Sequence, residues 1–425
     1  MGLTPSRLEI SRRSWLAAAL SAAACGCSSR PALRIWAHQG QEAEHAALAG
    51  IVEAFNRHHA AGSLRAELTF FPDFQYPEKL AIAAAAGDLP AAFELDGPLV
   101  ARFASAGLLA PLAGLFSAAE RRDFLPTIIE QGTFEGQLYS VGAFESATVL
   151  YGDREMLAGA GVAVPAAGQA FTWAELMLAC ERLKRSGVRP MSLHMNENAD
   201  EWFTYAFSPL LWSGGGALIG NDGSSVRGEL ASARNVASLR AWQALFELGY
   251  ASADPVDPDP FGGGKTALDW SGHWMMRSHV AKKGARLLVM PLPGVGPAPV
   301  AGCGTYCWGI ARPGHQQAAA GAWLRWVTDP EHGVTPLARA SGAIPGRRSA
   351  FSRFPEYDVM PYAWLKEQLE TIARPRPRTV FYSTLTQRFA AALRDIARGD
   401  DVAERLRRAE DEIARVIERR SGRRG

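Results

Sequence analysis

Beyond its N-terminal region, the sequence alternates between short apolar runs and longer stretches in which apolar residues recur at helical spacing. Strands are expected over 33–37, 66–70 and 91–95. A helix expected over 77–86 ends at Gly87, because glycine tolerates the left-handed conformation that follows a last helical turn. Alternating strands and helices form a parallel sheet with helices on its faces. The pattern therefore predicts an α/β fold.

Later segments carry their own boundary signals. Residues 138–141 and 148–151 are expected to be strands, and the polar pair Glu145-Ser146 between them marks a crossing from one lobe to another. Thr172 and Glu175 have the spacing of a capping box, in which each side chain satisfies a backbone donor of the other. This pair fixes the start of a helix.

A long amphipathic helix is expected at the C-terminal end, after the cap residues Asp401 and Glu404. Its apolar face is expected to comprise Val402, Leu406, Ala409, Ile413 and Val416. Such a face needs a partner surface. We therefore expect an extra C-terminal helical segment that packs on the rest of the protein.

The N-terminus has the pattern of an export signal. Arg12 and Arg13 precede an apolar stretch from Trp15 to Ala24, which is far shorter than the roughly 20 residues that span a bilayer. The arginine pair resembles a twin-arginine signal, and a chance pair in an ordinary secretory signal is the alternative. We expect residues 1–24 to be a signal peptide, and no later apolar run reaches about 18 residues.

Cys25 follows three alanines that resemble a lipoprotein box, with Ala in place of the usual Leu. The same alanines fit an ordinary signal-peptidase site. Acylation of Cys25 would tether a soluble body to a membrane surface. Both alternatives predict an exported protein, either periplasmic or on the outer face of the cell membrane.

The remaining cysteines give no catalytic or metal pattern. Cys180 shares a helical face with Trp173 and Leu176, so we expect it to be buried and unreactive. Cys303 and Cys307 form a disulfide, which an oxidising compartment allows, or remain as free buried thiols, because their spacing is poor for a bridge on a straight strand. We expect no metal and no cofactor.

Composition excludes several classes of protein. Hydrophobic residues make up 48% of the 425 residues, which is too much for a mostly disordered chain, and the length suggests two to three domains of about 150 residues. The 45 basic and 43 acidic residues nearly balance, and they are mixed along the chain. Because nucleic-acid binding needs a concentrated basic surface, we expect no nucleic-acid partner.

Several sequence blocks occur in the order that is found in one known family. The most specific is Phe261-Gly-Gly-Gly-Lys-Thr-Ala-Leu268, followed by Gly272-His-Trp274. Ala91, Gly152 and Leu268 stand where the family usually has Asp, Asn and Met. The other blocks lie at 87–96, 136–141, 149–157, 161–165, 172–176, 302–304, 322–331 and 342–345. From about residue 33 to residue 409, the chain resembles the extracellular solute-binding proteins of ABC importers, the family that includes maltose-binding proteins.

The resemblance implies a two-lobed periplasmic-binding-protein fold of the class II type, with a ligand cleft between lobes that close by hinge motion. It places lobe one at about residues 32–143 plus 302–343, and lobe two at about 146–301 plus 346–425. It implies a monomer that captures a sugar or oligosaccharide and delivers it to a membrane permease, without being an enzyme.

A saccharide site needs aromatic rings for the sugar faces and carboxylate or amide groups for the hydroxyls. Loops after the strands of an open α/β sheet face the ligand crevice, which selects the first four candidates. Glu145 lies in the crossing, and an alternative role for it is a structural salt bridge. Trp270 and Trp274 come from the family motif, and one of them is alternatively a core residue. The candidates are His38, Gln39, Gln41, Asp96, Glu145, Trp202, Trp270, Trp274, Tyr306 and Arg347.

Some features of the sequence suggest other functions. The stretch 262–266 suggests a phosphate-binding loop, but Asp259 stands where that motif requires its first glycine. An exported carbohydrate-active enzyme is the main rival, although no hydrolase motif is present in the sequence. The same scaffold with a non-sugar ligand, such as a glycerol phosphodiester held by Arg347, is a further alternative, as is an adhesin or receptor.

Overall fold

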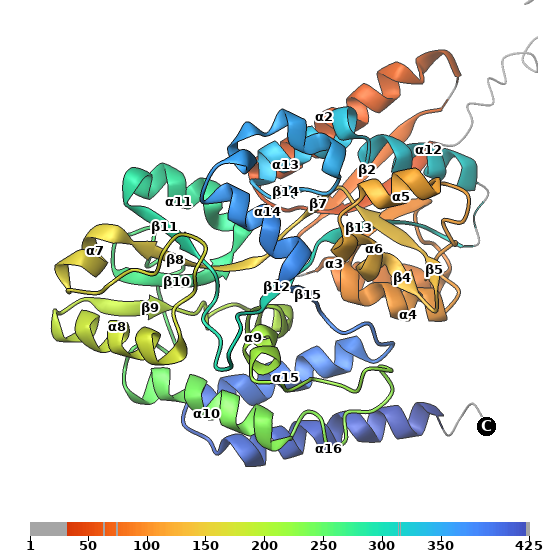
Figure 1. Cartoon of the computed structure of the whole chain (residues 1–425). Helices are drawn as coiled ribbons and strands as arrows, with labels where there is room; N and C mark the ends of the chain where they lie inside the picture. The colour runs from red at the N-terminus through yellow and green to blue at the C-terminus, as the bar shows by residue number, and fades with distance from the viewer. Residues whose placement is uncertain (1–31, 63, 74, 313, 315, 422–425) are drawn as a thin grey trace, which may run out of the picture.

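The computed structural model describes residues 32–62, 64–73, 75–312, 314 and 316–421. The expected signal peptide 1–24 and Cys25 lie outside these residues. The chain forms two lobes, each built around one β-sheet, and Figure 1 shows them side by side with helices on their outer faces. Within the described residues, no helix is both long and apolar enough to cross a membrane.

The first lobe contains a five-stranded sheet with the order β2-β1-β3-β13-β6. Its strands are β1 (Leu33–His38), β2 (Ala66–Phe71), β3 (Ala92–Asp96), β6 (Ser140–Gly142) and β13 (Tyr306–Ile310). The helices of this lobe are α2 (Glu42–His58), α3 (Tyr76–Ala86), α4 (Val100–Ser105), α5 (Ala118–Asp123), α6 (Pro126–Gly132), α12 (Gln317–Val327) and α13 (Thr335–Ser341). The strands predicted over 33–37, 66–70 and 91–95 are confirmed.

The expected parallel arrangement holds for these three strands, and later strands add an antiparallel part to the sheet. Strand β1 is parallel to β2 and β3, but β13 is antiparallel to β3 and to β6. The reason is topological, because β13 enters the first lobe from the second lobe rather than from a helix on the same sheet. Gly87 ends α3 with a φ of 68°, as predicted.

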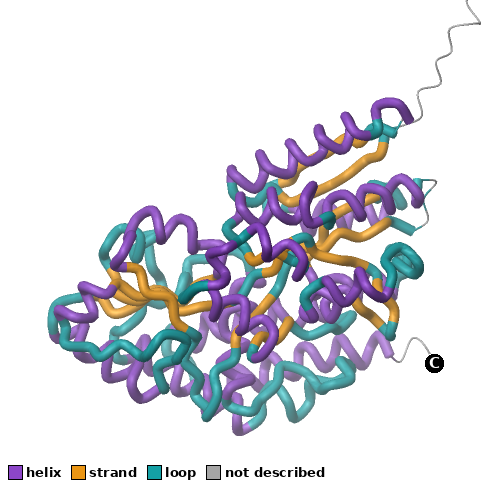
Figure 2. The backbone as a smooth tube through the Cα atoms, turned by 45° about the horizontal axis from the view of Figure 1, so that its top comes forward, coloured by secondary structure: helices purple, strands orange, loops and turns teal. Residues whose placement is uncertain are grey.

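The second lobe contains a four-stranded sheet with the order β11-β8-β10-β9. Its strands are β8 (Thr148–Asp153), β9 (Arg189–Ser192), β10 (Thr266–Gly272) and β11 (Leu287–Met290). Its helices are α7 (Arg154–Gly159), α8 (Trp173–Arg185), α9 (Asp200–Ser213), α10 (Ala233–Glu247), α11 (Met276–Lys283), α15 (Tyr382–Ala397) and α16 (Val402–Ser421). The tube view shows helices around the strands of both lobes (Figure 2). The predicted capping box of Thr172 and Glu175 begins α8.

Short strand pairs join the lobes. β7 (Phe144–Glu145) pairs with β14 (Ile344–Pro345), and β12 (Ala301–Cys303) pairs with β15 (Ala373–Pro375). A hairpin of β4 (Thr133–Phe134) and β5 (Gln137–Leu138) lies in the first lobe. Helix α14 (Tyr362–Thr371) lies between the lobes in Figure 1, where Trp364 approaches Gly168 of the second lobe.

Cys303 ends β12, Cys307 lies in β13, and both are free and buried. The free-thiol alternative therefore describes this structure. Cys180 is also free and fully buried in the core of the second lobe, as predicted.

The C-terminal helix α16 packs its apolar face on the second lobe, in one core with α9, α10 and α15. The backbone N–H of Glu404 donates to Asp401, so the predicted cap is present. One predicted position is wrong: Val416 is 38% exposed, whereas Ile417 is 7% exposed. The next large apolar residue that is buried after Ile413 therefore lies four positions further along the helix rather than three. A helix has 3.6 residues per turn, so buried positions on one face are separated by either three or four residues.

The difference in exposure between the two sides of α16 allows a test of how this helix packs on the second lobe. Replacing the fully buried Ile413 with Ala leaves a cavity against the second lobe and should cost about 2–5 kcal/mol of unfolding free energy. The matched control Val416→Ala, on the exposed side of the same helix, should change stability by less than about 0.5 kcal/mol. Urea unfolding measures both. Equal effects of the two variants would contradict the observed register of α16.

Candidate functional site

In the first lobe, three predicted site residues lie together at one edge of the sheet. His38 ends β1, Asp96 ends β3, and Tyr306 begins β13. Tyr306 lies opposite Asp96 in the register because the two strands are antiparallel. The rings of His38 and Tyr306 stack, with centroids 3.6 Å apart.

His38 is held as a cation by carboxylates around it. Burial alone would lower its pKa, but Glu94, whose Oε2 is 2.7 Å from Nδ1, and more weakly Glu44 and Asp73, raise the pKa of His38 to about 9. Burial raises the pKa of Glu44, and its like-charged neighbours Glu94 and Asp73 act in the same direction. This corner of the first lobe is therefore crowded with acidic groups around one buried cation.

The second lobe contributes a group of aromatic side chains. Trp202 and Tyr205 lie on α9, and Trp274 follows β10. The ring centroid of Trp274 is 6.1 Å from that of Trp202 and 5.5 Å from that of Tyr205. The indole of Trp274 lies so close over Gly272 that a Cβ there would overlap the ring, which explains the Gly-x-Trp spacing of the motif.

One arginine links the two lobes. The guanidinium of Arg376 donates to both oxygens of Asp96, at 2.8 and 2.6 Å, and also to Glu201 at the start of α9. The hydroxyl of Tyr382 donates to the same oxygen of Glu201. Asp96 belongs to the first lobe and Glu201 to the second. We refer to Asp96, Glu201, Arg376 and Tyr382 as the inter-lobe cluster.

The arginine of the inter-lobe cluster is almost completely buried, with a side chain that is 4% exposed. Burial alone would lower the pKa of Arg376, but Asp96 and Glu201 raise it well above its usual value. Burial raises the pKa of Glu201, against the attraction of Arg376. The guanidinium also lies over the ring of Tyr205, 4.9 Å from its centroid.

A second polar contact joins the lobes beside the cluster. The amide of Gln41, just before α2, donates to the backbone oxygen of Trp274 at 3.2 Å. The structure therefore brings together Gln41, Asp96, Trp202, Trp274 and Tyr306 from the sequence candidates, along with His38.

The other candidates lie elsewhere. Gln39 is exposed, and its backbone N–H donates to Phe71. Trp270 is completely buried in the core of the second lobe, where its indole N–H donates to Ala206. Arg347 is buried in the first lobe and pairs with Asp123 at 2.7 Å. We do not include Trp270 or Arg347 among the residues that face a ligand.

Sequence reasoning missed three members of the inter-lobe environment: Glu201, Arg376 and Tyr382. Arg376 lies in the Arg-Pro-rich stretch 374–378, a composition that is typical of a connector and gives no signal of a binding site. Glu201 directly precedes the predicted Trp202 and lies in the first turn of α9, where the helix dipole favours a carboxylate. An acidic residue directly before a predicted ligand-binding tryptophan was therefore the sequence feature that could have pointed to Glu201.

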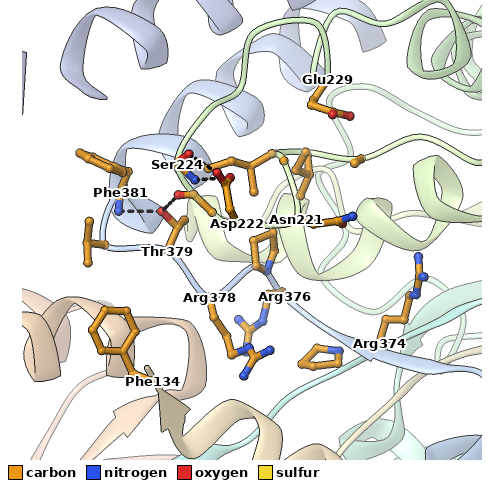
Figure 3. A pocket seen from close by; sticks show the side chains of 18 of the residues that line it. Phe134, Asn221, Asp222, Ser224, Glu229, Arg374, Arg376, Arg378, Thr379 and Phe381 are labelled. Atoms are coloured by element: carbon orange, nitrogen blue, oxygen red, sulfur yellow. Dashed lines mark hydrogen bonds between the residues drawn. The ribbon is translucent and has the colours of Figure 1, made fainter. Parts of the chain in front are cut away.

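A pocket of about 890 Å³ adjoins the cluster and shares Arg376 with it (Figure 3). It is lined by the β4–β5 hairpin of the first lobe, the glycine-rich loop after α9, and the stretch 374–381. Arg374 and Arg378 line this pocket. Trp202, Tyr205 and Trp274 do not line this pocket, so the aromatic group lies outside it. Among the described residues, no group of acidic, histidine or cysteine side chains has the arrangement of a metal site.

Residues 39–334 match the bacterial extracellular solute-binding protein family, and the chain belongs to that family. Solved structures with the same fold include the GacH receptor of Streptomyces glaucescens, studied unliganded and with acarbose, at a TM-score of 0.77 and 22% identity. The match covers 90% of this chain and 98% of that one.

Two further solved structures are similar over nearly their full length. The cyclic alpha-maltosyl-1,6-maltose binding protein of Arthrobacter globiformis has a TM-score of 0.75 and 22% identity, over 91% of this chain and 98% of that one. Maltose-bound MalE3 of T. maritima has a TM-score of 0.76 and 20% identity, over 90% and 99%. These structures share the two-lobed fold.

Glu145 lies in β7, one of the short strands that join the two lobes. It is completely buried, accepting from the amide of Gln131 at 2.8 Å and from the backbone N–H of Ser146 at 3.0 Å. Burial raises the pKa of Glu145 to about 7, against these hydrogen bonds. The folded protein therefore binds a proton at Glu145 that the unfolded chain has already released between about pH 4.5 and pH 7.

Glu145 therefore makes stability fall as pH rises through that window, by on the order of 3 kcal/mol. In Glu145→Gln this contribution is absent, so the decrease in melting temperature between about pH 5 and pH 7.5 should be smaller than in the wild type. The exposed Glu67→Gln serves as the control and should keep the wild-type profile. Identical profiles for Glu145→Gln and the wild type would contradict the assignment.

Proposed function

We propose that the protein is the substrate-binding component of an ABC importer, which captures a sugar or oligosaccharide between its lobes and delivers it to a membrane permease. The observation that carries this proposal is that aromatic rings of the second lobe lie close to carboxylates that come from both lobes. Trp274 and Trp202 supply flat surfaces for sugar rings, and Asp96 and Glu201 supply acceptors for hydroxyl groups.

The solved relatives support a saccharide ligand. The structures named above include receptors that bind acarbose, a cyclic maltosyl-maltose and maltose. Because their identity to this chain is low, the ligand itself has to be identified by experiment. A thermal-shift screen against a carbohydrate panel is suitable, since a ligand that binds the native state raises its melting temperature.

The lobes are proposed to comprise about residues 32–143 with 302–343, and about 146–301 with 346–425. Hydrogen bonds of the residues after β14 support a return of the chain to the second lobe later than residue 346. Ser349 donates to Asp123 of α5, which attaches the residues after β14 to the first lobe. We place the return to the second lobe after α14, where α15 and α16 join its core.

Export is proposed to use a signal peptide over 1–24 of the twin-arginine type. Cleavage before Cys25 would leave that residue for acylation, so that a monomeric body is tethered to the outer face of the cell membrane. Intact-mass measurement of the exported protein distinguishes a lipidated Cys25 from a free periplasmic form.

An exported glycosidase is the rival function. Such an enzyme needs one protonated and one ionised carboxyl group flanking the bond that is cut. Asp96 and Glu201 are both hydrogen-bonded to Arg376, whose guanidinium lies between them where a glycosidic bond would have to lie. This pairing favours binding over hydrolysis, and the return of intact oligosaccharide after incubation is the corresponding test.

Trp274→Ala should weaken binding of the saccharide found in the screen by at least about tenfold, because a central aromatic contact is lost. The measurement is isothermal titration. Trp326→Ala is the matched control, since Trp326 lies in the first lobe and packs on His332 and His58, away from the inter-lobe cluster. Equal affinities of Trp274→Ala and the wild type would remove Trp274 from the site.

A further inference from the structure

His194 has an unusual backbone conformation. It lies two residues after β9 and has a φ of 50°, in the left-handed region that residues with side chains rarely adopt. Residues in such a conformation persist only where the surrounding structure fixes them, and they cluster at functional sites. Glu135 has a similar φ of 47°, but it lies in the two-residue turn between β4 and β5, where such values are ordinary. No hairpin turn explains the conformation of His194.

A buried carboxylate holds the side chain of His194. Asp269 is completely buried in β10, and its two oxygens lie 2.7 Å from Nε2 of His194 and 3.0 Å from Nε2 of His279. Burial alone would raise the pKa of Asp269, but the two histidines lower it to about 2, so the carboxylate is ionised and accepts from both rings. Burial alone would lower the pKa of His194, but Asp269, and more weakly Glu197 and Asp259, raise it above its usual value. A charge-assisted hydrogen bond therefore fixes the imidazole of His194.

The ring of His194 packs against Trp202. The two rings meet edge to face, with centroids 5.6 Å apart and an interplanar angle of 86°. The indole N–H of Trp202 donates to the backbone oxygen of Leu193 at 3.2 Å, so two consecutive residues contact the same side chain. Trp202 in turn meets Trp274 edge to face, with centroids 6.1 Å apart. The loop after β9 therefore fixes one ring of the aromatic group.

We propose that His194 is a positioning residue, whose ring is held by Asp269 and sets the orientation of the Trp202 indole in the saccharide site. This inference rests on the proposed function, in which Trp202 is a surface for sugar rings, and deepens it by naming the residue that places that surface. His194 acts through Trp202 and does not need to touch the ligand, since its side chain is only 10% exposed.

His194→Gly removes the ring without disturbing the backbone. Glycine adopts a φ of 50° without strain, and Asp269 keeps its hydrogen bond to His279, so the variant should fold. Glu135→Gly is the matched control, because it removes a side chain at nearly the same φ in the first lobe. His194→Asn provides the same test if the glycine variant does not fold, since asparagine also tolerates this conformation.

Fluorine NMR of protein labelled with 5-fluorotryptophan reads the surroundings of Trp202 without any ligand. The signal of Trp202 is the one that disappears in Trp202→Phe. It should shift by more than its linewidth in His194→Gly, because the edge-to-face contact is lost, and it should stay in place in Glu135→Gly. Circular dichroism checks that the variants are folded. An unchanged Trp202 signal in folded His194→Gly would overturn the proposal.

A double-mutant cycle with maltose then separates this inference from the proposed function. Trp202→Phe and His194→Gly should each weaken maltose binding about fivefold in isothermal titration. Adding His194→Gly to Trp202→Phe should weaken it by less than about twofold more, because both changes act on one contact. Weaker binding in Trp202→Phe alone would overturn the role of His194 and leave the function standing. A wild type that binds neither maltose nor any other saccharide of the panel would contradict the function, while the fluorine signal would still decide whether His194 positions Trp202.

Discussion

The contact on which the rest of the structure depends is the buried guanidinium of Arg376, held between Asp96 of the first lobe and Glu201 of the second. A buried charge is tolerated only when it is paired and hydrogen-bonded, and removal of one partner of such a pair is strongly destabilising. The two lobes must therefore approach each other closely enough to supply both carboxylates. This requirement couples the relative position of the lobes to the chemistry of the cleft.

The same cluster explains why the fold suits reversible binding. The aromatic group around Trp274 belongs to the second lobe, and His38 and Tyr306 belong to the first. A saccharide needs aromatic rings for its faces and acceptors for its hydroxyl groups, and each lobe contributes residues of both kinds, so the proposed site is divided between the lobes. The short strand pairs between the lobes, including β7 with β14, are where we propose that a hinge movement takes place.

Much of the fold could be predicted from the sequence because the signals are local. The capping box of Thr172 and the glycine after α3 act within one turn, and both are confirmed. The direction of β13 could not be predicted, since it depends on a chain crossing between lobes. Asp96 and Trp274 were found from strand ends and a motif. Arg376 was missed because its partners lie 280 and 175 residues away in sequence.

The most direct test of the account is small-angle X-ray scattering of the protein with and without the saccharide that gives the largest thermal shift. Lobes that clamp a ligand between them should give a smaller radius of gyration when it is bound, and the saccharide should be recovered unchanged. A radius of gyration that stays constant at saturation, or a saccharide recovered as shorter fragments, would contradict the claim that this protein works by closing on its ligand.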